Sequence, residues 1–265
     1  MSKAKIWEKM TVAEMREALR ETHTVLVPVG IAEQHGYHLT LDTDSQTAWQ
    51  VCTRTAAHTG SFVAPLLSYG YSGGELPGTI NIDYHVIGLL IKDIIRALAA
   101  NGLKNIILVM GHGGTEHNRA TQEAAELFLR HHPEYADRNV AVFRFWQDAA
   151  ICREAFDGGD YHAGYFETSL MQYWAPDDVR PGEPPLDAPE LVAMMQQNPD
   201  NYQRRTSNVA HPDIIQRVGQ KPEIVVGVMG EPAKASRELG ERAAHDAIAK
   251  LTELIRVMEA GEGQK

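Results

Sequence analysis

Clusters of basic residues are missing from this sequence of 265 residues. Lys and Arg number 25 against 35 Asp and Glu, and the formal net charge is −10. A protein that binds a nucleic-acid backbone needs grouped positive charge, so this composition argues against nucleic acid as a partner. Small molecules are the ligands that it favours.

Cysteines and long apolar runs are scarce as well. Cys52 and Cys152 are the two cysteines, and their separation indicates neither a disulfide framework nor a thiolate metal site. No uninterrupted apolar run approaches the roughly 18 residues of a membrane helix, and the first residues lack the apolar core of a signal peptide. We therefore expect a soluble cytoplasmic protein with no membrane partner. With 43% hydrophobic residues the chain can bury one large core, and we expect a single domain over residues 1–265.

Apolar runs alternate with amphipathic segments along the chain. This pattern predicts an α/β fold with a mainly parallel central sheet covered on both faces. Ligands of such proteins bind at the carboxyl ends of the strands. Strands are expected at residues 24–29, 62–64, 106–110, 140–145 and 224–228, and helices at 11–20, 44–57, 84–100, 119–131, within 161–174, and at 233–258.

Two stretches break this alternation. Residues 69–79 carry four glycines and a proline, which favours a loop that can lie over a site. Residues 175–222 are rich in Pro, Asp, Asn and Gln, which indicates irregular excursions rather than a second core. Arg204 and Arg205 in this stretch could bind an acidic group, but a solvated or interface role is favoured.

Candidate metal ligands gather at the predicted strand ends. Glu33, His35 and Asp44 follow the first long strand, His112 follows the next within Gly-His-Gly-Gly, and a later segment offers His162 and Glu167. Imidazole and carboxylate ligands suit Zn²⁺, Mn²⁺ or Fe²⁺, and a carboxylate such as Asp44 can bridge two ions. Two neighbouring ions would activate water for attack on a carbonyl group.

Each group of residues also has an ordinary interpretation. A Glu-x-His pair is usually solvated, and the glycines around His112 could hold an anion at a helix N-terminus, although no phosphate-loop or dinucleotide pattern accompanies them. His162 could be a core or capping residue, and Glu167 could simply oppose a helix dipole. Five further histidines are expected to be exposed or hydrogen-bonded: His38, His85, His117, His131 and His132.

Five motifs, taken together and in order, resemble the creatininase family. They are the segment from Pro28 to Asp44 (P-x-G-x-x-E-Q-H-G-x-H-L, with Asp44 five residues after Leu39), Pro77-Gly78-Thr79, Gly111-His112-Gly113-Gly114, His162-x-Gly164-x-x-Glu167-Thr168-Ser169, and Gly230-Glu231-Pro232-x-x-Ala235. The resemblance implies a three-layer α/β/α sandwich and a divalent-metal hydrolase of ring amides or related bonds. It also implies two ions per subunit (Zn, Mn or Fe) and a homo-oligomer, with hexamers typical of the family.

The resemblance assigns roles to individual residues. Glu33, His35, Asp44 and His112 match metal ligands, with Asp44 bridging, and His162 matches the residue that moves protons. Gly114 stands where creatinine-opening members carry a glutamate ligand. Glu167 is the preferred substitute and the second catalytic candidate, Glu116 is the weaker one, and His38 and Asp42 are expected to orient the ligands.

The substrate implied by the resemblance is a small, cyclic and polar molecule, either a ring amide or a ring ketone, attacked by metal-activated water. Creatinine itself is disfavoured by Gly113, Gly114 and Gly158, because creatinine-opening members carry a tryptophan where this chain has Gly158. Other branches include a deformylase of flavin biosynthesis, a peptide-processing enzyme and the 3-dehydro-scyllo-inosose hydrolases of inositol catabolism, which cleave a carbon–carbon bond. An anion-binding α/β module is the non-enzymatic alternative.

Overall fold

A parallel sheet forms the centre of the molecule. The chain is described by a computed structural model of residues 4–262, so the three residues at each end of the predicted 1–265 domain lie outside the described part. The sheet has five strands in the order β1-β3-β2-β4-β5, and every pairing is parallel. This confirms the predicted sheet. Its strands are β1 (Lys5–Ile6), β2 (Thr24–Val29), β3 (Phe62–Val63), β4 (Asn105–Met110) and β5 (Asn139–Arg144).

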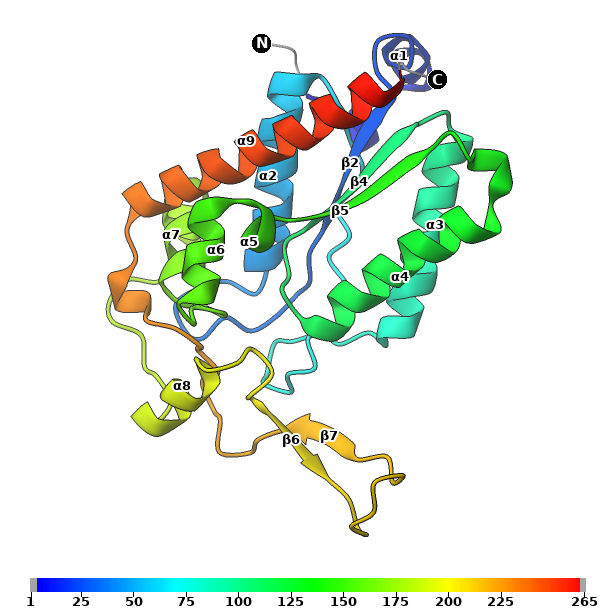
Figure 1. Cartoon of the computed structure of the whole chain (residues 1–265). Helices are drawn as coiled ribbons and strands as arrows, with labels where there is room; N and C mark the ends of the chain where they lie inside the picture. Colours follow the sequence, from blue (N-terminus) through cyan, green and yellow to red (C-terminus); the bar gives the residue numbers. More distant parts are fainter. Residues whose placement is uncertain (1–3, 263–265) are drawn as a thin grey trace.

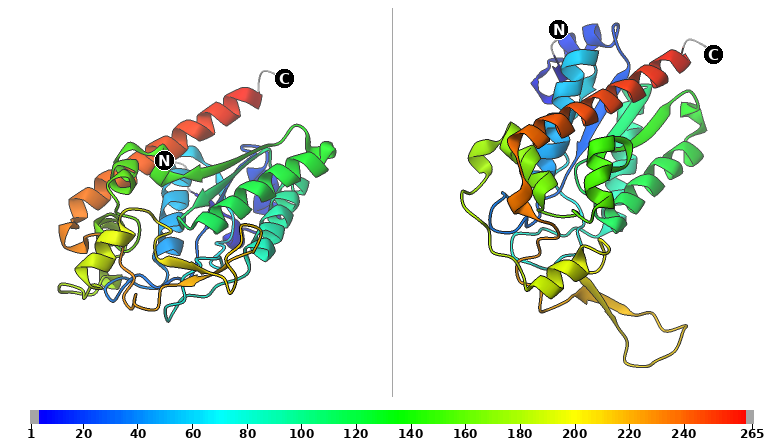
Figure 2. Two further views of the ribbon diagram at one scale, coloured as in Figure 1. Left: turned by 60° about the horizontal axis from the view of Figure 1, so that its bottom comes forward. Right: turned by 60° about the vertical axis from the view of Figure 1, so that its left-hand side comes forward.

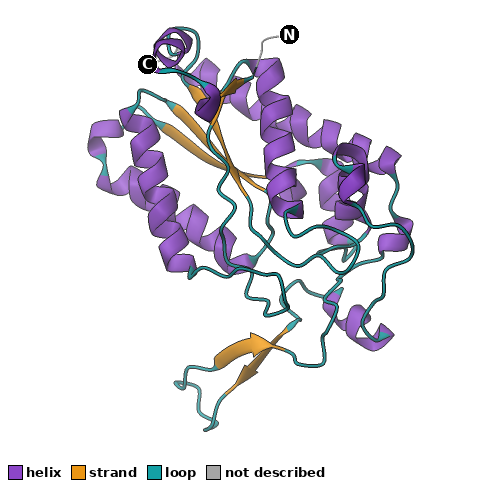
Figure 3. Cartoon of the chain, turned by 180° about the vertical axis from the view of Figure 1, so that it is seen from behind, coloured by secondary structure: helices purple, strands orange, loops and turns teal. Residues whose placement is uncertain are grey.

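Helices cover both faces of this sheet, so the predicted three-layer α/β/α sandwich is confirmed (Figure 1). Helices α3 and α4 pack together on one face, and α2, α7 and α9 pack together on the other, with the strands between the two groups when seen from behind (Figure 3). The helices are α1 (Val12–Ala18), α2 (Thr43–Thr59), α3 (Tyr84–Ala100), α4 (Thr115–His131), α5 (Phe145–Asp148), α6 (Ala150–Asp157), α7 (Tyr165–Trp174), α8 (Pro189–Met195) and α9 (Arg237–Glu262). None of these helices has the length and hydropathy needed to cross a membrane.

Local signals explain several helix ends. The Thr11 side chain accepts a hydrogen bond from the Glu14 amide while the Glu14 carboxylate accepts one from the Thr11 amide, which is a capping box at the start of α1. Helix α2 ends at Gly60, whose φ of 76° is the left-handed conformation that glycine tolerates. Asp83 caps α3 through the amide of His85. Each capping residue lies within a few positions of the helix end that it stabilises, so these helix ends can be predicted from the sequence.

The excursion after α7 holds elements that the sequence did not predict. Helix α8 and an antiparallel hairpin, β6 (Gln203–Thr206) and β7 (Arg217–Gln220), lie within it, and the hairpin projects away from the sandwich (Figure 2). The short helices α5 and α6 were also missed, and α4 begins four residues before its predicted start at residue 119.

The strand predicted at residues 224–228 is wrong. Three successive amides of this segment, those of Val225, Val226 and Gly227, donate hydrogen bonds to the Asp187 carboxylate at 2.8, 3.0 and 2.7 Å. One side chain thus satisfies backbone donors that a neighbouring strand would otherwise pair. The apolar composition correctly indicated burial for much of the segment, but its backbone is irregular.

Candidate metal centre

The carboxyl ends of β2 and β4 lie side by side and begin the site. Val29 and Met110 are the last residues of these strands and are partners in the sheet register. The loops that follow carry Glu33 and His35 from β2 and His112 from β4. Sequence reasoning placed these residues after strands, and the parallel register brings them to one edge.

Two glycines let the first turn of α2 pack directly onto these strand ends. A Cβ at Gly111 would lie 2.0 Å from the Asp44 carbonyl oxygen, and a Cβ at Gly30 would lie 2.5 Å from Ser45 Cα. No side chain fits at such distances. The glycines therefore place Asp44, the second residue of α2, among the residues at the strand ends.

Five side chains converge in what we call the acidic–histidine cluster: Glu33, His35, Asp44, His112 and Glu167. The Nδ1 atom of His112 lies 3.0 Å from both Glu33 Oε2 and Asp44 Oδ2. The Nε2 atom of His35 lies 3.3 Å from Asp44 Oδ1 and 3.5 Å from Glu167 Oε2. The two oxygens of Asp44 thus face two different histidines.

The donor atoms of this cluster fit divalent cations. Glu33 Oε2, His35 Nε2 and Asp44 Oδ2 are buried, and although they approach other cluster atoms they are not aligned for hydrogen bonds. Buried carboxylates without hydrogen-bond donors are costly unless they are paired or coordinate a metal. Two sets of three residues could each hold an ion, with ligand atoms within 4.8 Å of one another: Glu33, Asp44 and His112, and His35, Asp44 and Glu167. Asp44 belongs to both.

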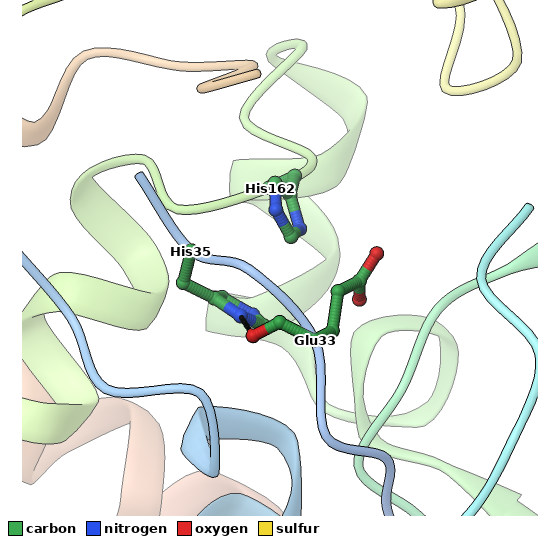
Figure 4. A group of neighbouring side chains, drawn as sticks. All are labelled: Glu33, His35 and His162. Atoms are coloured by element: carbon green, nitrogen blue, oxygen red, sulfur yellow. Dashed lines mark hydrogen bonds between the residues drawn. The ribbon is translucent and has the colours of Figure 1, made fainter. Parts of the chain in front are cut away.

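His162 lies beside the same cluster. Its ring centroid is 4.3 Å from that of His35, and Figure 4 shows the His162 ring next to His35 and facing Glu33. His162 Nε2 lies 2.7 Å from the carbonyl oxygen of Gln34, which accepts hydrogen bonds, and 3.1 Å from the side-chain nitrogen of Gln34, which donates them, so Gln34 holds the ring in place. Glu33, His35 and His162 form a third group whose potential ligand atoms lie within 4.8 Å of one another.

Electrostatics within the cluster are strong when only protein groups are present. Burial by itself would raise the pKa of Glu33, but His112, His162 and His35 hold it well below its ordinary value. Burial would lower the pKa of His35, yet Asp44 and Glu167 raise it well above the usual value. Against the same effect of burial, Glu33 and Asp44 raise the pKa of His112 to about 10. The cluster therefore attracts positive charge, whether carried by protons or by metal ions.

Two residues predicted to support the cluster have different surroundings. His38 is buried, which lowers its pKa to about 4, and its Nε2 lies 2.9 Å from the hydroxyl of Thr168, the neighbour of Glu167. Asp42 is exposed, and it accepts hydrogen bonds from the side chains of Thr40 and Gln46, which are not members of the cluster. These contacts do not support the prediction that Asp42 orients the ligands.

The glycine-rich loop at residues 69–79 does lie over the site, and one of its residues supports the cluster. The Ser72 hydroxyl donates a short hydrogen bond to Glu33 Oε1 and accepts one from the Gly74 amide at 3.1 Å. The Tyr202 hydroxyl donates to the Ser72 carbonyl at 2.8 Å, and the Glu75 amide donates to Gln220 Oε1 at 2.7 Å. Tyr202 and Gln220, at the base of the β6–β7 hairpin, thus hydrogen-bond to the glycine-rich loop, and Ser72 in this loop hydrogen-bonds to Glu33.

Replacing Ser72 with alanine is expected to weaken metal binding by about 10- to 100-fold, the effect of losing a partner that orients a ligand. Glu33 Oε1 would lose the hydroxyl that fixes it. Isothermal titration of metal-free protein with Zn²⁺ measures this effect. Ser68→Ala, a serine that lines a separate surface groove, is the matched control, and equal zinc affinity in both variants would contradict the role of Ser72.

A cavity of about 80 Å³ lies above the cluster. Phe156 and Tyr161 contribute aromatic surface, while Asp200 and Tyr202 form part of the wall supplied by the hairpin base. Sequence reasoning could not place these loop residues or Ser72, because no local pattern marks them. The glycine content of residues 69–79 was the one usable signal.

A parallel α/β sandwich with buried carboxylates and imidazoles at the carboxyl edge of its sheet is the arrangement of a metal-dependent hydrolase. The chain belongs to the creatininase family, because the family model described as creatinine amidohydrolase matches residues 8–255. This protein is therefore a metal-dependent hydrolase of the creatininase family.

Several characterised relatives are similar to the chain. Creatinine amidohydrolase of Pseudomonas putida is 34% identical over 197 residues, which cover 68% of this chain and 75% of the relative. The mycofactocin precursor peptide peptidase of Mycolicibacterium smegmatis is 32% identical over 226 residues, covering 82% and 78%. A 3-dehydro-scyllo-inosose hydrolase of Thermotoga maritima is 27% identical over 110 residues, covering 40% and 35%.

Solved creatininase structures match the whole fold. A manganese form superposes with a TM-score of 0.74 at 26% identity and covers 96% of this chain and 98% of that one. A creatininase variant described as the Zn–Zn type superposes with a TM-score of 0.73 at 27% identity, with the same coverage.

Proposed function

We propose that this protein is a two-metal amidohydrolase that opens or cleaves a small polar amide. The observation that carries this proposal is the pair of ligand sets that share Asp44 and that contribute residues to the lining of one cavity. Zinc and manganese are the favoured ions, because creatininase structures described with each of them share the fold. Iron suits the same donors but has no such support.

The two ions would share Asp44 and take their other ligands from different residues. Glu33, Asp44 and His112 would hold the first, and His35, Asp44 and Glu167 the second. Glu167 is favoured over Glu116 because its Oε2 already lies 3.5 Å from His35 Nε2. Glu116 belongs to none of the groups of potential ligands found among residues 4–262.

The surroundings of Gly114 leave no room for the glutamate ligand that creatinine-opening members carry at this position. A Cβ at Gly114 would lie 2.3 Å from His112 Nε2, so no side chain fits there while the loop has this conformation. A ligand from another element is therefore required, and Glu167 on α7 supplies it.

Bound divalent ions supply Lewis-acid polarisation of a carbonyl group and a water of lowered pKa. The protein's own contribution begins with His162, whose Nε2 lies 2.7 Å from the Gln34 carbonyl oxygen and 3.1 Å from the Gln34 side-chain nitrogen, which hold the ring. The imidazole would take a proton from the attacking water and pass it to the leaving group. Phe156 and Tyr161 provide apolar surface that orients a flat substrate and excludes water.

An amide substrate is favoured over the carbon–carbon alternative. The relatives named as a creatinine amidohydrolase and a peptide peptidase match 68% and 82% of the chain, whereas the inosose hydrolase matches 40%. Creatinine itself stays the less favoured ring amide, because of Gly113, Gly114 and Gly158. Cleavage of an amide in a short peptide is the second candidate, supported by the longer match to the peptidase.

The anion-binding alternative has little support from the site. Glu33, Asp44 and Glu167 converge there, and Glu116 occupies the first turn of α4, so an anion would meet several carboxylates.

A homo-oligomer is proposed as well, because α3 leaves Val86, Leu89 and Leu90 exposed by 53, 62 and 42%. A cytoplasmic location remains a prediction.

Elemental analysis followed by a substrate screen tests the proposed function. We expect two equivalents of zinc or manganese per chain and hydrolysis of one or more lactams, formamides or short peptides. Creatinine and keto-inositols belong in the same screen, because they test the two alternatives. Purified protein that takes up neither metal in stoichiometric amounts would contradict the proposal.

A further inference from the structure

The cavity has a pronounced imbalance of charge. Its lining includes the carboxylates of Glu33, Asp44, Glu167 and Asp200, and within residues 4–262 no Lys or Arg lines it. Arg204 and Arg205, which could have bound an acidic group, are exposed on β6 instead. A carboxylate on the substrate would therefore find no lysine or arginine from the described part of the chain in the cavity, and the two histidines that line it, His112 and His162, lie beside the cluster carboxylates.

Asp200 differs from the other three carboxylates because it lies outside the acidic–histidine cluster. It belongs to the turn that precedes β6, and its own amide donates to Asn198 Oδ1 at 2.9 Å, which fixes the turn. The Thr115 hydroxyl lies 3.1 and 3.2 Å from the two carboxylate oxygens and can donate one hydrogen. A carboxylate accepts about four hydrogen bonds, so the Asp200 carboxylate can accept further hydrogen bonds from a ligand or from water.

The acidic–histidine cluster and the wall at Asp200 also differ in their expected net charge. In the proposed function, two divalent ions would more than neutralise the three cluster carboxylates. Asp200 would then keep its negative charge uncompensated on the cavity wall. The cavity would attract a carbonyl oxygen at the cluster and a hydrogen-bond donor at Asp200.

We infer that this enzyme selects amide substrates that carry an amino, amidino or similar nitrogen donor, and that Asp200 is the residue that recognises this group. The inference rests on the proposed function and specifies its substrate class. It predicts that cationic substrates bind best, neutral ones less well and carboxylate-bearing ones worst.

Three five-membered lactams that differ in one substituent test this inference. The probes are pyrrolidinones that carry an aminomethyl, a hydroxymethyl or a carboxylate group on the carbon next to the ring nitrogen. Their dissociation constants are measured by NMR titration of zinc-loaded protein, and hydrolysis is followed in the same samples. The aminomethyl lactam should bind about tenfold more tightly than the hydroxymethyl lactam, because a hydrogen bond to a charged group is worth about that factor or more.

Asp200→Asn should abolish this tenfold preference, so that the aminomethyl and hydroxymethyl lactams bind with about equal affinity. Asp213→Asn is the matched control, since Asp213 is an exposed aspartate in the hairpin loop and the substitution removes the same charge outside the cavity. Equal or tighter binding of the carboxylate lactam, an unchanged preference in Asp200→Asn, or no binding of the aminomethyl lactam would each overturn the inference.

Metal content separates failure of this inference from failure of the proposed function. Zinc-loaded protein that hydrolyses the lactams without charge preference overturns the role of Asp200 alone. Protein that takes up no zinc contradicts the proposed function, and the same three titrations on that protein and on its Asp200→Asn variant then decide whether Asp200 selects the ammonium group.

Discussion

Replacing Asp44 with alanine is expected to remove both metal ions and all hydrolytic activity. Asp44 is 2% exposed, and its two oxygens face His112 and His35 separately. Both proposed ligand sets therefore lose one of three protein ligands at once. Loss of a residue that only orients a ligand costs up to about 100-fold in metal affinity, so loss of a shared ligand should exceed that factor at both sites.

Metal content after dialysis and the zinc dissociation constants measure this effect. Thermal unfolding of the metal-free proteins shows whether the fold survives the substitution. Asp42→Ala is the matched control, because Asp42 is exposed two residues earlier and contacts Thr40 and Gln46. A fully metal-loaded Asp44→Ala protein would refute the assignment of the centre.

Glu167→Gln is expected to lower the metal content from two ions per chain to one. Glu167 belongs to the ligand set of His35 and Asp44 but not to that of Glu33 and His112. Glutamine keeps the volume and an oxygen acceptor, and it removes the charge that favours a divalent ion. We expect hydrolysis to fall by at least about 100-fold, because both ions contribute to activating water and holding the carbonyl.

The choice of glutamine also protects the local backbone. Glu167 Oε2 accepts a hydrogen bond from the Ala163 amide at 2.6 Å, and Ala163 has a φ of 52°, which is uncommon for a residue other than glycine. The amide oxygen of glutamine can accept the same bond. Loss of metal would then reflect the missing charge rather than a displaced loop.

Glu116→Gln decides between the two glutamates that the sequence left open. Glu116 lies in the first turn of α4, two residues beyond the vacant position at Gly114. We expect Glu116→Gln to retain both ions. If Glu116→Gln loses an ion and Glu167→Gln does not, the second metal is held from α4 and the two proposed ligand sets are wrong.

Residues at strand ends were predictable because their placement depends on short-range patterns. An apolar run predicts a strand, the register of parallel strands aligns Val29 with Met110, and the loops after them carry Glu33, His35 and His112. Gly30 and Gly111 in the same motifs leave room for the first turn of α2 and so for Asp44. The order of these motifs was enough to predict the fold class and the family.

Other residues of the site depend on contacts that leave no periodic trace in the sequence. The Tyr202 hydroxyl reaches the Ser72 carbonyl across 130 positions, and the Ser72 hydroxyl reaches Glu33 across 39. Asp187 takes the place of a strand partner for residues 225–227, which is why an apolar segment there was mistaken for a strand.

The sequence by itself determined the parallel α/β class, the family, and the residue types gathered at the strand ends. Hydrophobic periodicity and short motifs encode these features locally. Only the tertiary structure decided that Asp44 faces two histidines, that the Glu167 carboxylate approaches His35, and that Asp200 stands on the wall of an acidic cavity. These features depend on distances between elements far apart in the chain, and such distances are set by packing of the whole sandwich rather than by any local pattern.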